Sequence, residues 1–253
     1  IRIIMQPGTA KKITVNGVRK SAAELSEVIN AVLFCPDDLN LIKEGAAVRR
    51  RLLDNAISQI RPRYAELLSD FNKLYENKSR ILKDWHEKPS LLDALDEFSD
   101  AMCRASAQLI RYQAARPIHS EFSGSGEKLE IKYKTVSTVK NVYSSAKEIY
   151  YDICEHQEAH RRAELDSGQC LTGAHKDDLE IFINGRPARS FASQGQTRTA
   201  ALSMKLAERE IFLAETGEYP ILLLDDVLSE LDPRRQEFVL NRIRGGQVFI
   251  TCC

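Results

Sequence analysis

Residues 221–226 read ILLLDD and directly follow Pro220, while residues 191–196 read FASQGQ and precede a stretch of helical periodicity. Four consecutive aliphatic residues are typical of a strand buried on both faces, and such strands occur in parallel sheets covered by helices. The sequence therefore predicts an α/β fold in which a core strand ends in two aspartates.

Asp225 and Asp226 follow the predicted strand at its carboxyl end, where ligands bind in open α/β sheets. Mg²⁺ prefers oxygen ligands and keeps several waters while it bridges phosphates. Asp225 is therefore a candidate Mg²⁺ ligand, and Asp226 is a candidate for orienting or deprotonating an attacking water. Solvated acids at a loop are the alternative interpretation of the same pair.

Ser193, Gln194, Gly195 and Gln196 stand at the start of a helix whose apolar face includes Ala200, Met204, Ala207 and Ile211. The N-terminus of a buried helix presents free N–H groups and a partial positive charge, and Gly195 offers an approach without a side chain. This combination suits a phosphate. A simple N-cap by Ser193 is the alternative explanation.

These motifs resemble those of ATP-binding-cassette (ABC) ATPases. Residues 192–196 (ASQGQ) are similar to the signature motif, residues 221–226 to Walker B, and residues 229–232 (SELD) to the D-loop. The resemblance implies ATP and Mg²⁺ as cofactors, with nucleotide contacts from the signature residues 193–196 and from Asp232. Many members carry glutamate where this chain has Asp226, so the base assignment rests on a shorter side chain.

A narrower resemblance, to the bacterial RecF family, covers nearly the whole chain. It is carried by residues 188–232, by GAHKDD at 173–178, by FCPDDL at 34–39 and by RRRLLD at 49–54. It implies a cytoplasmic, DNA-binding recombination mediator that acts at single-strand/double-strand junctions in DNA repair, replication and the SOS response. It also implies slow DNA-dependent ATP hydrolysis, a RecR-type partner, and an ATP-dependent homodimer in which Ser193 and Gly195 act in trans while both aspartates act in cis.

Two departures from the family pattern stand out. The sequence has no Gly-x-x-x-x-Gly-Lys-Ser/Thr phosphate loop, which the family carries near its N-terminus. Because the chain opens on the strand-like residues IRII, we expect an upstream segment that holds this loop. At the other end, residues 247–251 (QVFIT) read as a final core strand, and any switch residue beyond it is not seen.

The net charge of zero limits how the chain can bind DNA. Lys plus Arg and Asp plus Glu each total 36, so no overall positive field attracts nucleic acid and any contact must be a local patch. Arg49, Arg50 and Arg51 form the candidate DNA-binding cluster, although a solvated face or a set of ion pairs is the alternative. The six cysteines lack metal-binding spacing and indicate reduced thiols, and no apolar run is long enough to span a membrane.

The predicted organisation is an ABC-type ATPase head with an inserted helical second lobe. The head comprises residues 1–50 and 168–253, and the helical lobe comprises residues 51–167. Hairpins are predicted over 11–19 and 179–191, each around an Asn-Gly pair. Apolar stripes predict a helical hairpin, with a first helix that starts or kinks at Pro62 and a second over 91–115, then a strand at 129–133 and a third helix over 142–165.

Two other functions fit parts of the pattern. A nucleotide-binding subunit of a transporter needs a coupling groove for membrane helices, and the long helical insertion argues against it. A scaffold that binds nucleotide or a partner without hydrolysis fits the lack of the phosphate loop. Residues 173–178 could either contact nucleotide or support the edge of the sheet. Structural support is the slightly favoured interpretation.

Overall fold

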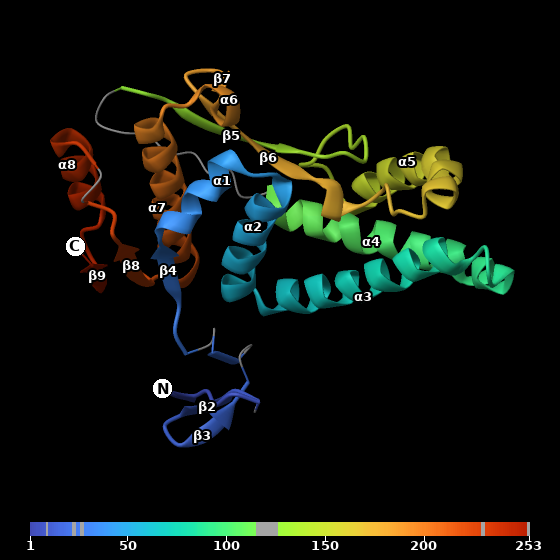
Figure 1. Cartoon of the computed structure of the whole chain (residues 1–253), viewed down its shortest axis with the longest axis horizontal. Coiled ribbons are helices and arrows are strands. Elements are labelled where there is room, and N and C mark those ends of the chain that lie inside the picture. Colours follow the sequence, from blue (N-terminus) through green and yellow to red (C-terminus); the bar gives the residue numbers. More distant parts are fainter. Residues whose placement is uncertain (9, 22–23, 26–27, 115–125, 229–230, 252–253) are drawn as a thin grey trace.

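The computed structural model describes residues 1–8, 10–21, 24–25, 28–114, 126–228 and 231–251. A head of mixed sheet and helix carries a projecting arm of long helices, and a small antiparallel hairpin sheet lies beside the head (Figure 1). The elements, in chain order, are β1 (Arg2–Ile4), β2 (Lys12–Val15), β3 (Val18–Lys20), β4 (Ala31–Phe34), the 3-10 helix η2 (Pro36–Leu39), α1 (Asn40–Lys43), α2 (Ala46–Ile60), α3 (Pro62–Asp84), η3 (Pro89–Ala94), α4 (Leu95–Ala114), β5 (Leu129–Lys134), α5 (Ala146–Ser167), η4 (Ala174–Lys176), β6 (Asp178–Ile183), β7 (Arg186–Pro187), α6 (Ala188–Phe191), α7 (Gln194–Thr216), β8 (Ile221–Asp225), α8 (Pro233–Arg242) and β9 (Val248–Thr251).

The predicted apolar strand is β8, the middle strand of a parallel sheet in the order β4-β8-β9. Leu222 and Leu224 are buried in the main core of the head together with Val32 and Phe34 of β4. The residues that alternate with them are more open, and Leu33 is 47% exposed. The parallel strand is therefore confirmed, but its two faces are not equally buried.

The last predicted strand is present as β9, but it is less buried than predicted. It pairs with β8 from Leu222↔Val248 to Asp225↔Thr251, so it is bound on one side only. Phe249 is 51% exposed, and Ile250 and Thr251 are exposed as well. The expectation of a core strand was wrong because β9 lies at the edge of the sheet in the described structure.

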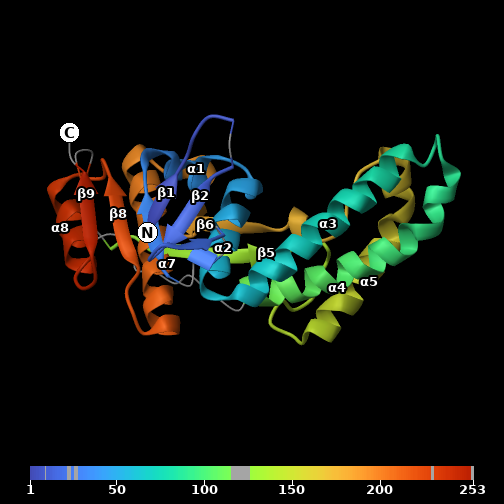
Figure 2. The same cartoon turned by 90° about the horizontal axis from the view of Figure 1, so that it is seen from below.

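Helix α7 packs its apolar face into the same core, as the helical spacing predicted. Ala200, Leu202 and Met204 are fully buried. The helix ends at Gly217, whose φ of 78° is the left-handed conformation that closes many helices. A short connection then leads into β8, so the two elements run in opposite directions, and the start of α7 lies at the same end of the head as the end of β8 (Figure 2).

Both Asn-Gly hairpins are present. Asn16 and Gly17 join β2 to β3, Asn184 and Gly185 join β6 to β7, and all four have positive φ, as a type I′ turn requires. The second hairpin is shorter than predicted because β7 ends at Pro187 and the chain turns into α6. β5 extends this sheet by pairing along its whole length with β6.

The arm is built from α3, α4 and α5, which pack along one another (Figure 2). Pro62 begins α3, and Arg61 before it is extended, as expected for a residue preceding proline. Helix α4 has 20 residues, about 30 Å at about 1.5 Å per residue, because Pro89–Ala94 forms a 3-10 turn in place of the first predicted turn. Ala115, the predicted end, lies outside the described residues. The third helix is α5, and a capping box between Ser145 and Glu148 begins it four residues later than predicted.

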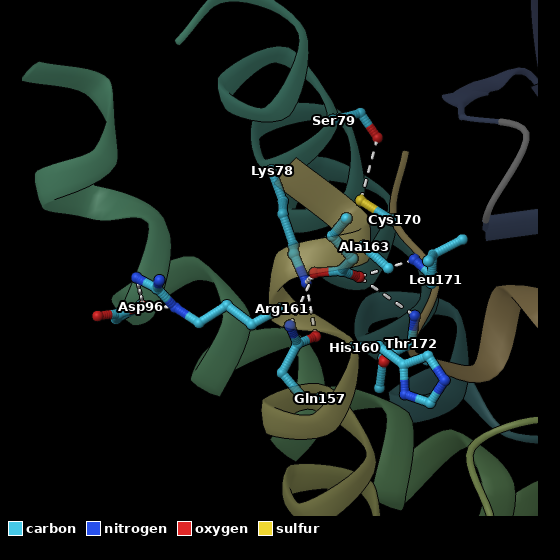
Figure 3. Close-up of polar contacts among 12 residues, drawn as sticks. Lys78, Ser79, Asp96, Gln157, His160, Arg161, Ala163, Cys170, Leu171 and Thr172 are labelled. Atoms are coloured by element: carbon cyan, nitrogen blue, oxygen red, sulfur yellow. Dashed lines mark hydrogen bonds and ion pairs between the residues drawn. The ribbon is translucent and has the colours of Figure 1, made fainter. Parts of the chain in front are cut away.

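A buried ion pair fastens the arm to the segment that returns to the head (Figure 3). Lys78 of α3 and Glu164 of α5 are 2.7 Å apart, with 0% and 1% of their side chains exposed. Gln157 accepts from Lys78 at 2.6 Å and donates to Glu164 at 2.7 Å. The other oxygen of Glu164 accepts from the backbone N–H groups of Leu171 and Thr172. These contacts satisfy the buried charges, which burial requires.

No helix among the described residues is long and apolar enough to cross a membrane. The four described cysteines are free thiols. Cys252 and Cys253 lie outside the described residues.

Candidate functional site

Asp225 and Asp226 lie where the sequence predicted, at the carboxyl end of β8. Asp225 is exposed, and its Oδ1 accepts a 2.5 Å hydrogen bond from the hydroxyl of Thr251 at the end of β9. The same hydroxyl accepts from the backbone N–H of Asp226 at 3.1 Å. Asp226 has a φ of 50°, a left-handed conformation that aspartate tolerates better than most residues. Thr251 therefore fixes the turn that presents both carboxylates.

The donor set at this turn fits Mg²⁺ in type, because the groups available are carboxylate and hydroxyl oxygens. The described part of the chain holds no cluster of three or more His, Cys, Asp or Glu residues that could enclose a metal ion by itself. Mg²⁺ sites often use one or two carboxylates and complete their coordination with water and substrate phosphates.

Ser193 caps α7 in a complete capping box. Its hydroxyl accepts from the N–H of Gln196 at 3.2 Å, and the side-chain oxygen of Gln196 accepts from the N–H of Ser193 at 2.9 Å. The N-cap interpretation is therefore confirmed as a structural role. Within the described part of the chain, the N–H groups of Gln194 and Gly195 have no hydrogen-bond acceptor, so the first turn keeps two donors for an anion.

Gly195 is covered by a side chain that the sequence did not single out. A Cβ at this position would collide with Nη1 of Arg235 and lie 3.3 Å from its Cζ. Arg235 comes from α8, where Nε lies 3.3 Å from Asp232, and its Nη2 lies 3.6 Å from Glu127. Glu127 also accepts a 2.7 Å hydrogen bond from Gln196.

Asp232 is the N-cap of α8, since its side chain accepts from the N–H of Arg235 at 3.1 Å. The signature turn and the end of the D-loop are thus in contact through Arg235. The only sequence signal for Arg235 was its position three residues after an N-cap, and nothing in the sequence pointed to Glu127. Ser229 and Glu230 of the D-loop lie outside the described residues.

The three consecutive arginines have three different environments. Arg49 is 5% exposed and forms a bidentate pair with Asp178, at 2.7 and 2.9 Å, while its Nη1 donates to the carbonyls of Leu41 and Glu44. All three guanidinium nitrogens donate hydrogen bonds inside the protein, so Arg49 is not available as a DNA contact. The ion-pair alternative describes this residue.

Arg50 is half-buried and donates to the backbone carbonyl of Asp177 at 2.6 Å. Arg51 is exposed at an open pocket of about 330 Å³, which it lines with Asp37, Asp38, Glu44 and Lys205 among others. Of the three arginines, Arg51 alone presents its side chain freely to solvent.

The segment at 173–178 joins the head to the arm. Asp177 is buried, and its carboxylate accepts from the N–H of Val136 at 3.0 Å and lies 2.9 Å from the hydroxyl of Tyr133. Burial raises the pKa of Asp177 to about 7. Burial also lowers the pKa of His175 to about 4. Together with the Arg49–Asp178 pair, these contacts favour the structural interpretation of this segment.

Comparison with known proteins places these features in a family. The chain is 40% identical over 255 residues to the DNA replication and repair protein RecF of Lysinibacillus sphaericus, covering 95% of this chain and 68% of that protein. It is 37% identical to RecF of Acetivibrio thermocellus, covering 100% of this chain and 71% of that protein. No family model matches the chain.

Solved structures of RecF proteins resemble this chain in fold as well. A structure of the recombination mediator protein RecF-ATPrS in the RecFOR pathway superimposes with a TM-score of 0.87 at 35% identity, covering 99% of this chain and 70% of that one. A structure of RecF-ATP gives a TM-score of 0.85 at 34% identity. The fold is thus that of an ABC-type ATPase head, and the chain belongs to the RecF family of DNA replication and repair proteins.

Proposed function

We propose that the chain acts in an ATP-driven, DNA-binding recombination mediator that works at single-strand gaps during DNA repair and replication restart. The observation that carries the proposal is the placement of the signature turn, Ser193–Gln196, at the same end of the head as Asp225 and Asp226. Similarity to RecF-ATP supports ATP as the nucleotide. We also propose the two-lobe division, with residues 1–50 and 168–253 as head and 51–167 as helical lobe.

The proposed chemistry is slow ATP hydrolysis. Asp225 would hold Mg²⁺, which would neutralise charge on the transferred phosphoryl group. Thr251 keeps the Asp225 carboxylate oriented through its hydroxyl. Asp226 would orient or deprotonate the attacking water, and its fixed left-handed backbone limits where that carboxylate can reach.

We infer that the signature turn acts on nucleotide bound by a second copy of the chain. The free N–H groups of Gln194 and Gly195 and the positive end of α7 would receive the terminal phosphate of that nucleotide. In a symmetric dimer both sites would close together. Asp232 would contribute from the D-loop at the same contact.

DNA and a RecR-type protein are the proposed partners, at junctions of single-stranded and double-stranded DNA, in the cytoplasm. Membership of a DNA replication and repair family supports the DNA partner. With Arg49 committed to the interior, the remaining arginine candidates are Arg50 and Arg51. The exposed Arg51 is the better placed of the two for a phosphate.

The test exploits the fact that aspartate caps helices as well as serine does. Ser193→Asp should preserve the cap and the thermal stability while its charge repels an incoming phosphate. If Ser193 contacts phosphate in trans, the full-length variant will bind ATP as a monomer but fail to dimerise in sedimentation velocity with ATP and Mg²⁺. Ser193→Arg should fail in the same way through bulk. Normal dimerisation of Ser193→Asp would leave Ser193 as a helix cap only, and a wild type that stays monomeric with ATP on DNA would contradict the proposed function.

A further inference from the structure

Arg235 occupies an electrostatically unusual place. Its guanidinium lies directly over Gly195 in the first turn of α7, where the helix dipole favours anions and disfavours cations. The side chain is only 17% exposed, so solvent screens this mismatch weakly. A cation held there needs a nearby anion to compensate.

Glu127 supplies that anion. Its carboxylate lies 3.6 Å from Nη2 of Arg235 and accepts a 2.7 Å hydrogen bond from Gln196 of the signature turn. Asp232 also contacts this guanidinium, with 3.3 Å between its carboxylate and Nε. A carboxylate beside a helix N-terminus and a guanidinium is the arrangement that an anion-binding site adopts when its anion comes from the same chain.

Geometry limits what can reach this turn. Gly195 has no side chain to bar an approach, and the N–H groups of Gln194 and Gly195 stay free within the described residues. Arg235 nevertheless covers Gly195, so an incoming phosphate meets the guanidinium first. Arginine can pair with a phosphate through two parallel N–H donors, and it would exchange its 3.6 Å contact with Glu127 for that pair.

We propose that Arg235 is a second phosphate-contacting residue at the signature turn, held in reserve by Glu127 until the nucleotide of a second copy arrives. Glu127 is then an internal competitor of the phosphate, and the contact of Arg235 with Asp232 links nucleotide capture to the D-loop. This inference rests on the proposed ATP-driven dimer. It adds Arg235 as a phosphate contact and Glu127 as the group that restrains Arg235 before the phosphate binds.

Neutral substitutions of Arg235 and of Glu127 should change the affinity of the ATP-dependent dimer in opposite directions. In the full-length gene product, Arg235→Gln should weaken ATP-dependent dimerisation by about tenfold or more, the loss expected for a charged hydrogen bond. Glu127→Gln should strengthen it, because the guanidinium no longer has to leave a carboxylate. The double variant should behave like Arg235→Gln, and Arg235→Lys should rescue part of the affinity.

Sedimentation equilibrium over a range of ATP concentrations with Mg²⁺ measures these affinities, and thermal unfolding of each variant checks the fold. Arg234→Gln and Glu130→Gln are matched controls, because both residues are exposed neighbours of the same charge. They should dimerise like the wild type.

The results separate two kinds of failure. If the wild type dimerises with ATP and both single variants weaken dimerisation equally, the contact is a structural brace and the inference is overturned. It is equally overturned if Arg235→Gln dimerises like the wild type. If the wild type itself does not dimerise with ATP, the proposed function fails first and takes this inference with it.

Discussion

The hydroxyl of Thr251 donates a 2.5 Å hydrogen bond to Oδ1 of Asp225, joining the last residues of two neighbouring parallel strands. The same oxygen accepts from the N–H of Asp226 at 3.1 Å. One hydroxyl therefore orients the candidate metal ligand and fixes the backbone of the candidate base. An uncharged side chain thus organises the acidic turn.

Replacing Thr251 by valine should impair hydrolysis more than stability. Valine keeps the branched shape that suits a strand but removes both hydrogen bonds, so Asp225 loses its orientation. We expect Thr251→Val to lower the Mg²⁺-dependent ATPase rate of the full-length protein by about tenfold, the equivalent of one hydrogen bond. Thr251→Ser keeps the hydroxyl and should retain most of the rate. Equal rates for the valine variant and the wild type would exclude this orienting role.

Asp226→Asn should nearly abolish hydrolysis while leaving ATP binding intact. The amide has the same shape but cannot accept a proton, so only the step that needs a base is lost. Asp225→Asn should instead raise the Mg²⁺ concentration needed for half-maximal nucleotide binding. Titrations with a fluorescent ATP analogue and steady-state rates distinguish the two. An Asp226→Asn variant that turns over at the wild-type rate would remove the base assignment.

Arg49 and Arg51 should separate stability from DNA binding. Arg49→Ala removes a buried guanidinium, so the partly exposed carboxylate of Asp178 loses its counter-charge and two backbone carbonyls lose a donor. This should cost about 3 kcal/mol of unfolding free energy, the lower end of the range for a broken buried pair. Arg51→Ala removes an exposed side chain and should change stability by less than about 0.5 kcal/mol.

The same pair of variants is then compared on DNA. The logarithm of the DNA-binding constant falls linearly with the logarithm of the salt concentration, and each lost phosphate contact reduces that slope by about one unit. Arg51→Ala should therefore reduce the slope by about one unit. DNA affinity is measured by fluorescence anisotropy between low and moderate salt. An unchanged slope for a folded Arg51→Ala protein would place the DNA surface elsewhere.

The sequence was a good guide where a local pattern decides the structure. The apolar run at 221–224 is typical of a core strand, and Asn-Gly pairs favour left-handed turns, so β8 and the two hairpins were predictable. Ser193 and Gln196 were likewise readable as a helix start, because a capping box is a spacing rule.

The sequence was a poor guide where partners come from distant segments. RRR at 49–51 looks the same whether it faces solvent or the interior, and only the arrival of Asp178 from 129 residues away makes Arg49 internal. Glu127 and Arg235 meet over Gly195 for the same reason. The depth of β9 was also missed, because an apolar strand reads alike at the edge and in the middle of a sheet.

Asp177 should make stability depend on pH. Its folded pKa of about 7 lies above the usual value near 3.9, so the folded protein holds this proton more tightly than the unfolded chain. The resulting stabilisation is complete below about pH 4 and is lost as pH rises through about 7. Tyr133 explains why a proton is tolerated there: its single hydroxyl hydrogen can go to Gln113 at 2.6 Å, and a protonated Asp177 can then donate to Tyr133 at 2.9 Å.

Asp177→Asn is neutral at every pH and should abolish that dependence. The difference in unfolding free energy between wild type and variant should change by on the order of a few kcal/mol from pH 4 to pH 8. The wild type should become less stable relative to the variant as pH rises. The neighbouring charge of Arg50 and the half-buried His175 are present in both proteins, so their contributions cancel in the difference. Urea unfolding at several pH values measures it, and a constant difference would show that Asp177 does not titrate in this range.

The buried pair of Lys78 and Glu164 should be costly to break and cheaper to replace as a unit. Lys78→Met leaves the Glu164 carboxylate buried without its counter-charge, which should cost about 3–5 kcal/mol of unfolding free energy. Adding Glu164→Gln should recover part of this loss, because a neutral amide oxygen can still accept from the N–H groups of Leu171 and Thr172. The exposed pair Lys73 and Asp70 on the same helix is the control, and Lys73→Met should cost less than about 1 kcal/mol. Urea unfolding of the three variants and the wild type decides the matter, and a double variant no more stable than Lys78→Met would show that the unpaired charge is not the source of the cost.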